Sequence, residues 1–247
     1  MEEERKERTE ILLGKTALEK LKNSCVGVAG LGAVGSYAIE ALARAGVGKF
    51  IIADFDIIHQ SNINRNLFAL TSTVGMSKTE VCMKRIKEIS PSIEVEIFSE
   101  FLDANTIDIF LSKRPDVLID AIDSLNPKIT LLIRACEMNI PVVSSMGAGR
   151  RKDPLSVTVN DISETKICPL ARKVRERLRK KGITSGIKCI FSTEIPLEPA
   201  KDFEELYTPD ERKTRPRRPV GTLSTVTGIF GLLVAHTVLK ILLPEDL

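Results

Sequence analysis

Residues 25–54 read CVGVAGLGAVGSYAIEALARAGVGKFIIAD, and this stretch decides the fold. A short apolar run enters the glycine turn GLGAVG at 30–35, a helix of small residues follows, and a second apolar run ends at Asp54. Glycines in such a turn let the backbone approach phosphate groups, and the N-terminus of the helix adds partial positive charge. An acidic residue after the second strand holds the ribose hydroxyls of a nucleotide. The stretch therefore predicts a nucleotide site that uses Gly30, Gly32, Gly35 and Asp54.

The segment that follows favours a triphosphate over a dinucleotide. SNINRN at 61–66 comes soon after Asp54, and GMSK at 75–78 begins a further helix. A dinucleotide site neutralises its diphosphate with backbone N–H groups, whereas a triphosphate carries more charge and a leaving group. Arg65 and Lys78 are cations suited to that ligand, and Asn62 is a neutral donor. We therefore expect ATP rather than the nicotinamide cofactor of a dehydrogenase.

A pair of carboxylates follows another apolar run, in IDAIDS at 119–124. In an open parallel sheet, ligands bind at the carboxyl ends of the strands, and a carboxylate there can hold Mg²⁺ against phosphates. Asp123 also suits the N-cap of the next helix. Asp120 is either a second site residue or structural.

Composition excludes several classes of protein. The 247 residues are 43% hydrophobic and only 4% aromatic, without tryptophan, so the chain can form a core but not an aromatic platform for single-stranded nucleic acid. The five cysteines form no CxxC pair, which indicates free thiols and no zinc ribbon. The apolar run at 228–243 contains His236 and Lys240 and is short for a membrane span, so we expect a buried helix rather than an anchor.

Apolar runs alternate with helical patterns along the chain, which predicts an α/β, Rossmann-like fold with a mostly parallel sheet flanked by helices. Residues 1–150 form the expected ATP-binding region, and 151–247 form a substrate-facing extension of the same compact unit. Besides the first strand–helix–strand unit, we expect strands over 93–98, 117–121, 141–145, 156–159 and 188–192, helices over 9–22, 77–90, 103–111, 125–139, 169–181 and 222–243, and loops over 55–77 and 196–219.

Positive charge is concentrated in the C-terminal part of the chain. Residues 1–150 hold 18 basic and 20 acidic side chains, whereas 151–247 hold 18 and 13. One basic cluster lies in the helix expected over 169–181 and another in the loop expected over 196–219. Such clusters are either solvated surface or contacts for a nucleic acid backbone. Their members include Arg172, Lys173, Arg175, Arg177, Arg179, Lys180, Lys181, Arg212, Lys213, Arg215, Arg217 and Arg218.

Five motifs in order, GLGAVG, ADFD, SNINRN, GMSK and IDAIDS, resemble the ubiquitin-activating-enzyme-like family, of the ThiF and MoeB type. The resemblance implies binding of ATP and Mg²⁺ and activation of a carboxylate. We also expect a homodimer, and the free thiols indicate a reducing, cytoplasmic compartment. Asp54 would then hold the ribose, Asp123 the metal, and Arg8 would reach the ATP of a partner subunit. Ala33 replaces a usual glycine, and Lys6 a usual aromatic residue. The positions that match the family's nucleotide-binding and phosphate-activating residues are Gly30, Gly32, Gly35, Asp54, Asp56, Asn62, Arg65, Lys78, Asp123 and Ser124.

The later stretches SSMGAG at 144–149, ICPLA at 167–171 and KCIFSTE at 188–194 resemble a narrower subgroup, the tRNA threonylcarbamoyladenosine dehydratases. This resemblance implies ATP-dependent closure of a threonylcarbamoyl side chain into a ring. It also implies tRNA contacts by Arg172, Lys173, Arg175, Arg179, Arg215, Arg217 and Arg218. The alternatives are adenylation of the C-terminal carboxylate of a sulfur-carrier protein, and a module that binds ATP without turnover.

Further expectations concern Cys189, the loop after the strand at 141–145, and partners. Cys189 is either a nucleophile that carries an acyl group or a small buried residue of a strand. The resemblance allows a monovalent cation, Na⁺ or K⁺, at the loop that contains Ser144, Ser145, Gly147 and Ala148. It also allows a sulfur-trafficking protein partner. No stable membrane insertion is expected.

Overall fold

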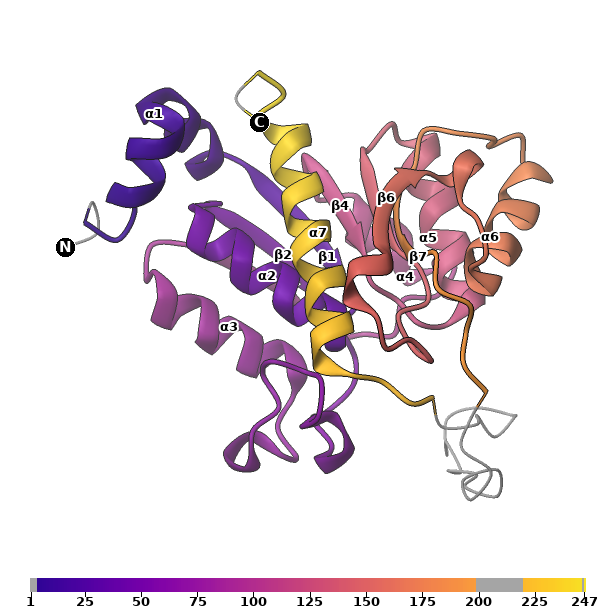
Figure 1. The fold of residues 1–247 in the computed structure, drawn as a ribbon. Helices are drawn as coiled ribbons and strands as arrows, with labels where there is room; N and C mark the ends of the chain where they lie inside the picture. The colour runs from indigo at the N-terminus through magenta and orange to yellow at the C-terminus, as the bar shows by residue number, and fades with distance from the viewer. Residues whose placement is uncertain (1–3, 199–219, 246) are drawn as a thin grey trace.

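The computed structural model describes residues 4–198, 220–245 and 247, and it is built on one seven-stranded sheet (Figure 1). The strand order is β3-β2-β1-β4-β5-β7-β6, and every strand is parallel to its neighbour except β6, which runs antiparallel to β7. The α/β class and the mostly parallel sheet are as predicted. The strands are β1 Cys25–Ala29, β2 Lys49–Ala53, β3 Glu94–Phe98, β4 Val117–Asp120, β5 Val142–Ser145, β6 Val157–Asp161 and β7 Lys188–Ser192.

Helices cover both faces of the sheet, each over its own hydrophobic core. On one face lie α1 Glu7–Lys22, α2 Ala33–Ala45, α3 Lys78–Ile89 and α7 Ser224–Leu242. On the other lie α4 Thr106–Leu111, α5 Leu125–Glu137 and α6 Pro169–Arg179. Short 3₁₀ helices complete the described elements: η1 Gln60–Asn62, η2 Thr71–Thr73, η3 Pro154–Ser156 and η4 Ile162–Glu164.

Strands β1 and β2 are apolar after their first residue because both faces of each strand are covered. In β2, Phe50 and Ile52 point into the core beneath α2 and α7, whereas Ile51 and Ala53 point into the core beneath α4 and α5. This alternation follows from the two-residue period of a strand. It explains why the run KFIIA has no polar position after its first residue.

Helix α7 lies across the sheet against α2, between α2 and β6 (Figure 1). The two helices approach closely at Gly231, where a Cβ atom would lie 2.5 Å from the Cβ of Tyr37 and 2.6 Å from the carbonyl oxygen of Val34. Among the described residues, α7 is the one helix long and apolar enough to cross a membrane, and 56% of its most apolar window is buried inside the protein. The packing agrees with the buried helix that the sequence predicts over 222–243.

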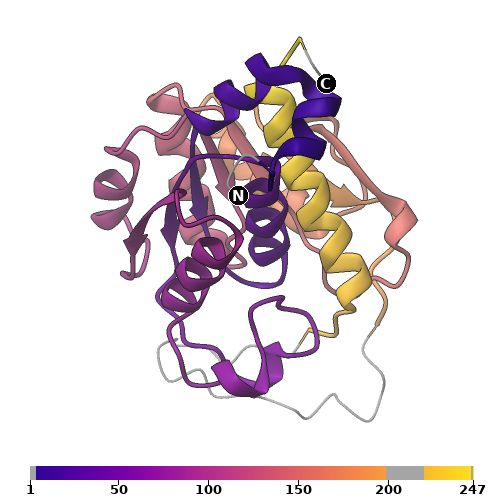
Figure 2. The same cartoon turned by 90° about the vertical axis from the view of Figure 1, so that its left-hand side faces the viewer.

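Different helices and loops lie at the two ends of the molecule (Figure 2). The end of α7 and helix α1 lie at one end, and the loop after β2 and the start of α7 lie at the other. The second end is where the parallel strands finish, so it is the expected ligand edge.

Two local predictions need correction. The helix expected over 103–111 begins only at Thr106, because the carboxylate of Asp103 accepts the N–H groups of Asn105 and Thr106 and so stabilises the turn before it. The loop expected over 55–77 contains η1, η2 and a bridge between Ile57 and Ser77. Most of the loop expected over 196–219 lies outside the described residues, since the structure resumes at residue 220.

Candidate active site

Each of the three glycines in the turn between β1 and α2 is suited to its position for a different structural reason. Gly30 has a φ of +98°, and a Cβ atom there would lie 2.8 Å from the carbonyl oxygen of Ala121. A Cβ atom at Gly35 would lie 2.0 Å from the carbonyl oxygen of Gly30, so this glycine lets α2 pack against the turn. A Cβ atom at Gly32 would meet nothing within 4 Å, because this position faces open space in the pocket. The first N–H groups of α2 are therefore accessible to an anion.

Asp54 braces the same turn. Its two oxygens accept the N–H groups of Leu31 at 2.8 Å and Asp56 at 2.9 Å, and its Oδ2 lies 3.8 Å from Nζ of Lys78. Burial raises the pKa of Asp54 above its ordinary value, and the nearby Lys78 ammonium opposes that rise. The carboxylate is thus preorganised beside the turn, at the edge of the pocket.

A pocket of about 750 Å³ lies at the carboxyl edge of the sheet and is bordered by the glycine turn. Its walls also include the loop at 145–149, Leu170 at the start of α6, and the segment at 220–222. Gly35 does not line this pocket but lies behind it in α2. The predicted nucleotide-site residues that line the pocket are Gly30, Gly32, Asp54, Asp56, Asn62, Arg65, Lys78, Asp123 and Ser124.

Two cations lie in this pocket. Nζ of Lys78 lies 3.1 Å from Oδ2 of Asp56, and its side chain is nearly buried. Arg65 donates from Nη1 to the carbonyl oxygen of Ser61 at 2.7 Å and to the side-chain oxygen of Asn64 at 2.9 Å. Burial lowers the pKa of Arg65, and the carboxylate of Asp123 acts in the opposite direction. The pocket therefore combines backbone donors with two partly desolvated cations, an arrangement that suits a polyphosphate.

Asp123 lies just beyond β4, and its Oδ1 accepts the hydroxyl of Ser124 at 3.3 Å. No group of three metal-ligating side chains occurs within the described part of the chain. Mg²⁺ does not require one, since it binds through one or two carboxylates together with substrate phosphates and water. The carboxylate of Asp123 lines the same pocket as Arg65 and Lys78, and its oxygen donors fit Mg²⁺ carried in with a nucleotide.

The motifs do not identify every residue of the pocket. Phe55 and Phe101 pack edge to face, with ring centroids 4.9 Å apart, and both line the pocket. Val220 and Thr222 also line the pocket. Two hydrogen bonds hold their segment: N of Arg150 donates to the carbonyl of Gly221 at 2.8 Å, and Nδ2 of Asn64 donates to that of Thr222 at 3.3 Å. These contacts join distant parts of the sequence, and no local pattern indicates them.

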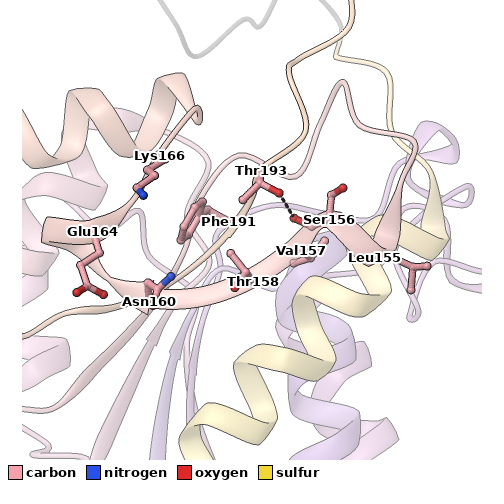
Figure 3. A pocket seen from close by; sticks show the side chains of 9 residues that line it. All are labelled: Leu155, Ser156, Val157, Thr158, Asn160, Glu164, Lys166, Phe191 and Thr193. Atoms are coloured by element: carbon pink, nitrogen blue, oxygen red, sulfur yellow. Dashed lines mark hydrogen bonds between the residues drawn. The ribbon is translucent and has the colours of Figure 1, made fainter.

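A second pocket, of about 710 Å³, lies against β6 and β7 (Figure 3). Asn160, Glu164 and Lys166 lie at one end of it, and at the other end the hydroxyl of Thr193 donates to the carbonyl of Ser156 at 3.2 Å. None of the predicted nucleotide-site residues lines it. The first pocket is therefore the candidate active site.

Cys189 does not have the surroundings of a nucleophile. It is fully buried in β7, between the sheet and the helices on the α5 and α6 face, and it does not line the pocket. Burial raises the pKa of its thiol far above the ordinary value, so the thiolate is strongly disfavoured. The structure thus supports the buried-residue alternative for Cys189 over the catalytic one.

Arg8 lies in the exposed first half of α1, ahead of the non-helical Gly14, and it does not line the pocket of its own chain. A role for Arg8 at a nucleotide therefore requires a second subunit.

The basic helix α6 divides its cations between surface and structure. Arg172, Lys173 and Arg179 are exposed. Arg175 is half-buried and donates to the carbonyl and the hydroxyl oxygen of Thr165, so it holds the turn that precedes the helix. A tRNA contact by Arg175 remains a prediction, and in this structure the side chain is bonded within the protein. Arg215, Arg217 and Arg218 lie outside the described residues.

Comparison with known proteins supports the same reading of the motifs. Residues 5–246 match the model of the ThiF family. The chain is 40% identical over 237 residues to a tRNA threonylcarbamoyladenosine dehydratase of Bacillus subtilis, covering 95% of this chain and 93% of that one. Crystal structures of the Escherichia coli tRNA N6-threonylcarbamoyladenosine dehydratase in complex with AMP and with ATP are similar, with TM-scores of 0.87 and 0.86. Both have 33% sequence identity and cover 98% of this chain and 95% of the other.

Proposed function

Because the chain belongs to the ThiF family, we propose that it is an ATP-dependent tRNA threonylcarbamoyladenosine dehydratase, which closes the threonylcarbamoyl side chain of a modified adenosine into a ring. The observation that carries this proposal is the 40% identity to such an enzyme over 95% of the chain. The pocket supports it, because the predicted phosphate-binding residues meet there.

The chemistry requires activation of a carboxylate. A free carboxylate is a poor electrophile, since its leaving group would be oxide or hydroxide. Transfer of an adenylyl group from ATP to one carboxylate oxygen, with release of pyrophosphate, or of a phosphoryl group, with release of ADP, creates a good leaving group. The carbamoyl group of the same nucleoside then attacks the activated carbon, loses a proton, and expels AMP or phosphate. In the net reaction, the nucleoside loses one water and ATP is hydrolysed.

Each part of the pocket has a role in this scheme. The glycine turn, Arg65 and Lys78 hold the phosphates and neutralise the charge on the leaving group. Asp54 holds the ribose, and Asp123 would hold Mg²⁺, which would screen the phosphate charge. Ring closure within one nucleoside has a high effective molarity, so no enzyme nucleophile is needed. The burial of Cys189 is compatible with that scheme.

The tRNA contact is assigned to the exposed cations of α6. Leu170 in the first turn of α6 lines the pocket, and Arg172, Lys173 and Arg179 are exposed on the same helix. Cations so placed would bind phosphates of an RNA whose modified base enters the pocket. The cluster of Arg215, Arg217 and Arg218 would extend this contact.

We also propose a cytoplasmic homodimer in which Arg8 of one protomer reaches the nucleotide of the other. Ile11 and Leu12 on the same helix are 71% and 80% exposed, and a second copy would cover this apolar pair. The loop with Ser145 and Gly147 is the proposed place of a monovalent cation. That site is separate from the Mg²⁺ site at Asp123.

The decisive experiment incubates the protein with ATP, Mg²⁺ and threonylcarbamoylated tRNA and then measures the nucleoside mass. Loss of one water, with consumption of ATP, is expected. An unchanged nucleoside with a competent tRNA would refute the proposal. Adenylation of a carrier protein ending in Gly-Gly would then indicate the carrier-activating alternative, and ATP binding without turnover would indicate a binding module.

A further inference from the structure

Lys128 is a cation of α5 that does not touch the pocket, yet it connects the two loops that form one side of it. Its side chain has no solvent exposure, and neither does that of Asp120 at the end of β4. Nζ of Lys128 lies 2.5 Å from Oδ2 of Asp120. It also donates to the carbonyl of Ser145 at 3.0 Å and lies 3.4 Å from the hydroxyl of Ser144. One ammonium thus links α5 to the carboxyl ends of β4 and β5.

The same network shapes both loops. Oδ1 of Asp120 accepts the N–H of Ile122 at 3.1 Å, which sets the turn that leads to Asp123. Residues 121–124 form one wall of the pocket. The carbonyl of Ser145 begins the loop at 145–149, which forms the adjoining wall. Both walls therefore start from groups bonded directly to the network.

The network is internally satisfied. Asp120 accepts from Lys128, from the hydroxyl of Ser144 at 2.6 Å and from the backbone of Ile122. Among the ion pairs of the described residues, the pair of Lys128 and Asp120 alone has two side chains without solvent exposure. A buried polar network with every member paired is rigid and admits one arrangement. The ammonium of Lys128 thus fixes the ends of β4 and β5 relative to each other.

We propose that Lys128 is a positioning residue: it fixes the loops at 121–124 and 145–149 relative to each other and thereby directs the carboxylate of Asp123 at the metal-bound nucleotide. The inference rests on the proposed function only in taking Mg²⁺ and ATP as the ligands. Arg65 and Lys78 approach the pocket from other elements, so their hold on the nucleotide does not depend on this network.

The test measures binding of a fluorescent ATP analogue with and without Mg²⁺. In Lys128→Met, the affinity without Mg²⁺ should stay within threefold of wild type, whereas the gain on adding Mg²⁺ should fall at least tenfold. Asp123→Asn should lose the same gain, and the double variant Lys128→Met/Asp123→Asn should lose no more than either. Additive losses would show that Lys128 does not act through Asp123 and would overturn the proposal.

Stability is separated from positioning by a variant that leaves no unpaired charge. Lys128→Met alone leaves the Asp120 carboxylate buried without its cation, so its melting temperature should fall. Lys128→Met/Asp120→Asn should recover melting temperature without recovering the Mg²⁺-dependent affinity. Recovery of both would mean that the pair only supports the fold. Lys113→Met is the control, because Lys113 pairs with Glu96 at the surface, at 2.6 Å, and should leave every readout unchanged.

The binding assay needs no tRNA, so its outcome is distinguishable from failure of the proposed function. A wild-type protein that gains ATP affinity from Mg²⁺ but leaves the nucleoside unchanged would refute the dehydratase and not the role of Lys128. With active wild-type protein, Lys128→Met should lower kcat and raise the KM for ATP in the presence of Mg²⁺, in step with the Mg²⁺-dependent affinity that is lost. Wild-type values of both kcat and KM in this variant would overturn the positioning role.

Discussion

Replacing Gly32 by alanine should leave the fold intact and remove most of the nucleotide affinity. Gly32 has a φ of −77°, which alanine adopts readily, and the new methyl group would meet no protein atom within 4 Å. A compatible change from glycine to alanine stabilises a protein by about 0.4 to 1 kcal/mol, because the unfolded chain loses freedom. The free energy of unfolding of the variant should therefore equal that of the wild type or exceed it slightly.

The same methyl group would occupy space that the phosphates need. Forcing an extra carbon into a filled site costs about 1 to 3 kcal/mol. Since about 1.4 kcal/mol is tenfold in a dissociation constant, the affinity for ATP should fall by roughly 5- to 150-fold.

Gly35→Ala is the matched variant, with the opposite signature. Its Cβ atom would lie 2.0 Å from the carbonyl oxygen of Gly30, whereas ordinary contact begins at 3.4 Å, so α2 must move away from the turn. Overpacking of this kind costs about 1 to 3 kcal/mol of folding free energy or more. Chemical denaturation and ATP titration of both variants test this reasoning. Equal loss of stability in the two variants, or wild-type ATP affinity in Gly32→Ala, would refute it.

Three further predictions follow from the site. Cys189→Ala should keep full ring closure and lose about 1 kcal/mol of stability on denaturation, and a stably folded variant without turnover would restore Cys189 as a nucleophile. Because burial raises the pKa of Asp54, the folded protein binds this proton at a higher pH than the unfolded chain. The ionised form therefore costs stability above the raised pKa, and this cost is relieved as the pH falls. The affinity for ATP should weaken as the pH falls through this range, since a protonated carboxyl is a poorer acceptor for ribose hydroxyls. ATP titrations at several pH values test this, and the affinity of Asp54→Asn should not change with pH. Reversing the charges of Arg172 and Arg179 should weaken tRNA binding and reduce its salt slope by about 0.7 to 0.9 per phosphate contact, whereas Arg175→Ala should lower the melting temperature with the slope unchanged.

The fold could be predicted because its signals are local. The glycine turn lies between two short apolar runs, and the conformations of Gly30 and Gly35 are demanded by neighbours a few residues away or by the adjacent strand. Pocket residues such as Asp54 and Asp123 could be predicted because they follow strand ends, which meet at one edge of a parallel sheet. Helix boundaries differ by a few residues, since side chains such as Asp103 stabilise turns ahead of a helix.

The buried ion pair of Lys128 and Asp120 could not be predicted from local sequence signals. Lys128 lies in an amphipathic helix, where a lysine is normally solvated. Its burial depends on Asp120 and Ser144, which are brought together only when β4 and β5 pair. Charge alone does not identify such a residue, because its partner is defined by tertiary structure.

Arg175 illustrates a signal that was present in the sequence. The apolar positions of α6, Ala171, Val174 and Leu178, define its buried face, and Arg175 follows Ala171 by four residues, on the same side. Arg172 and Arg179 lie outside that stripe. Helical periodicity could therefore have separated the structural arginine from the solvated ones.

The packing of α7 on α2 has a consequence for synthesis of the protein. Helix α2 carries the glycine turn at its start, yet its apolar side is covered by a helix that begins at Ser224, so a nascent chain emerges with this side bare until nearly all of it has been translated. Domains fold as units, and chains with exposed apolar surface are prone to aggregate. The ribosome-bound intermediate is thus a candidate client for chaperones, and a premature stop codon before residue 224 should yield an insoluble product even though every nucleotide-binding motif has already been made.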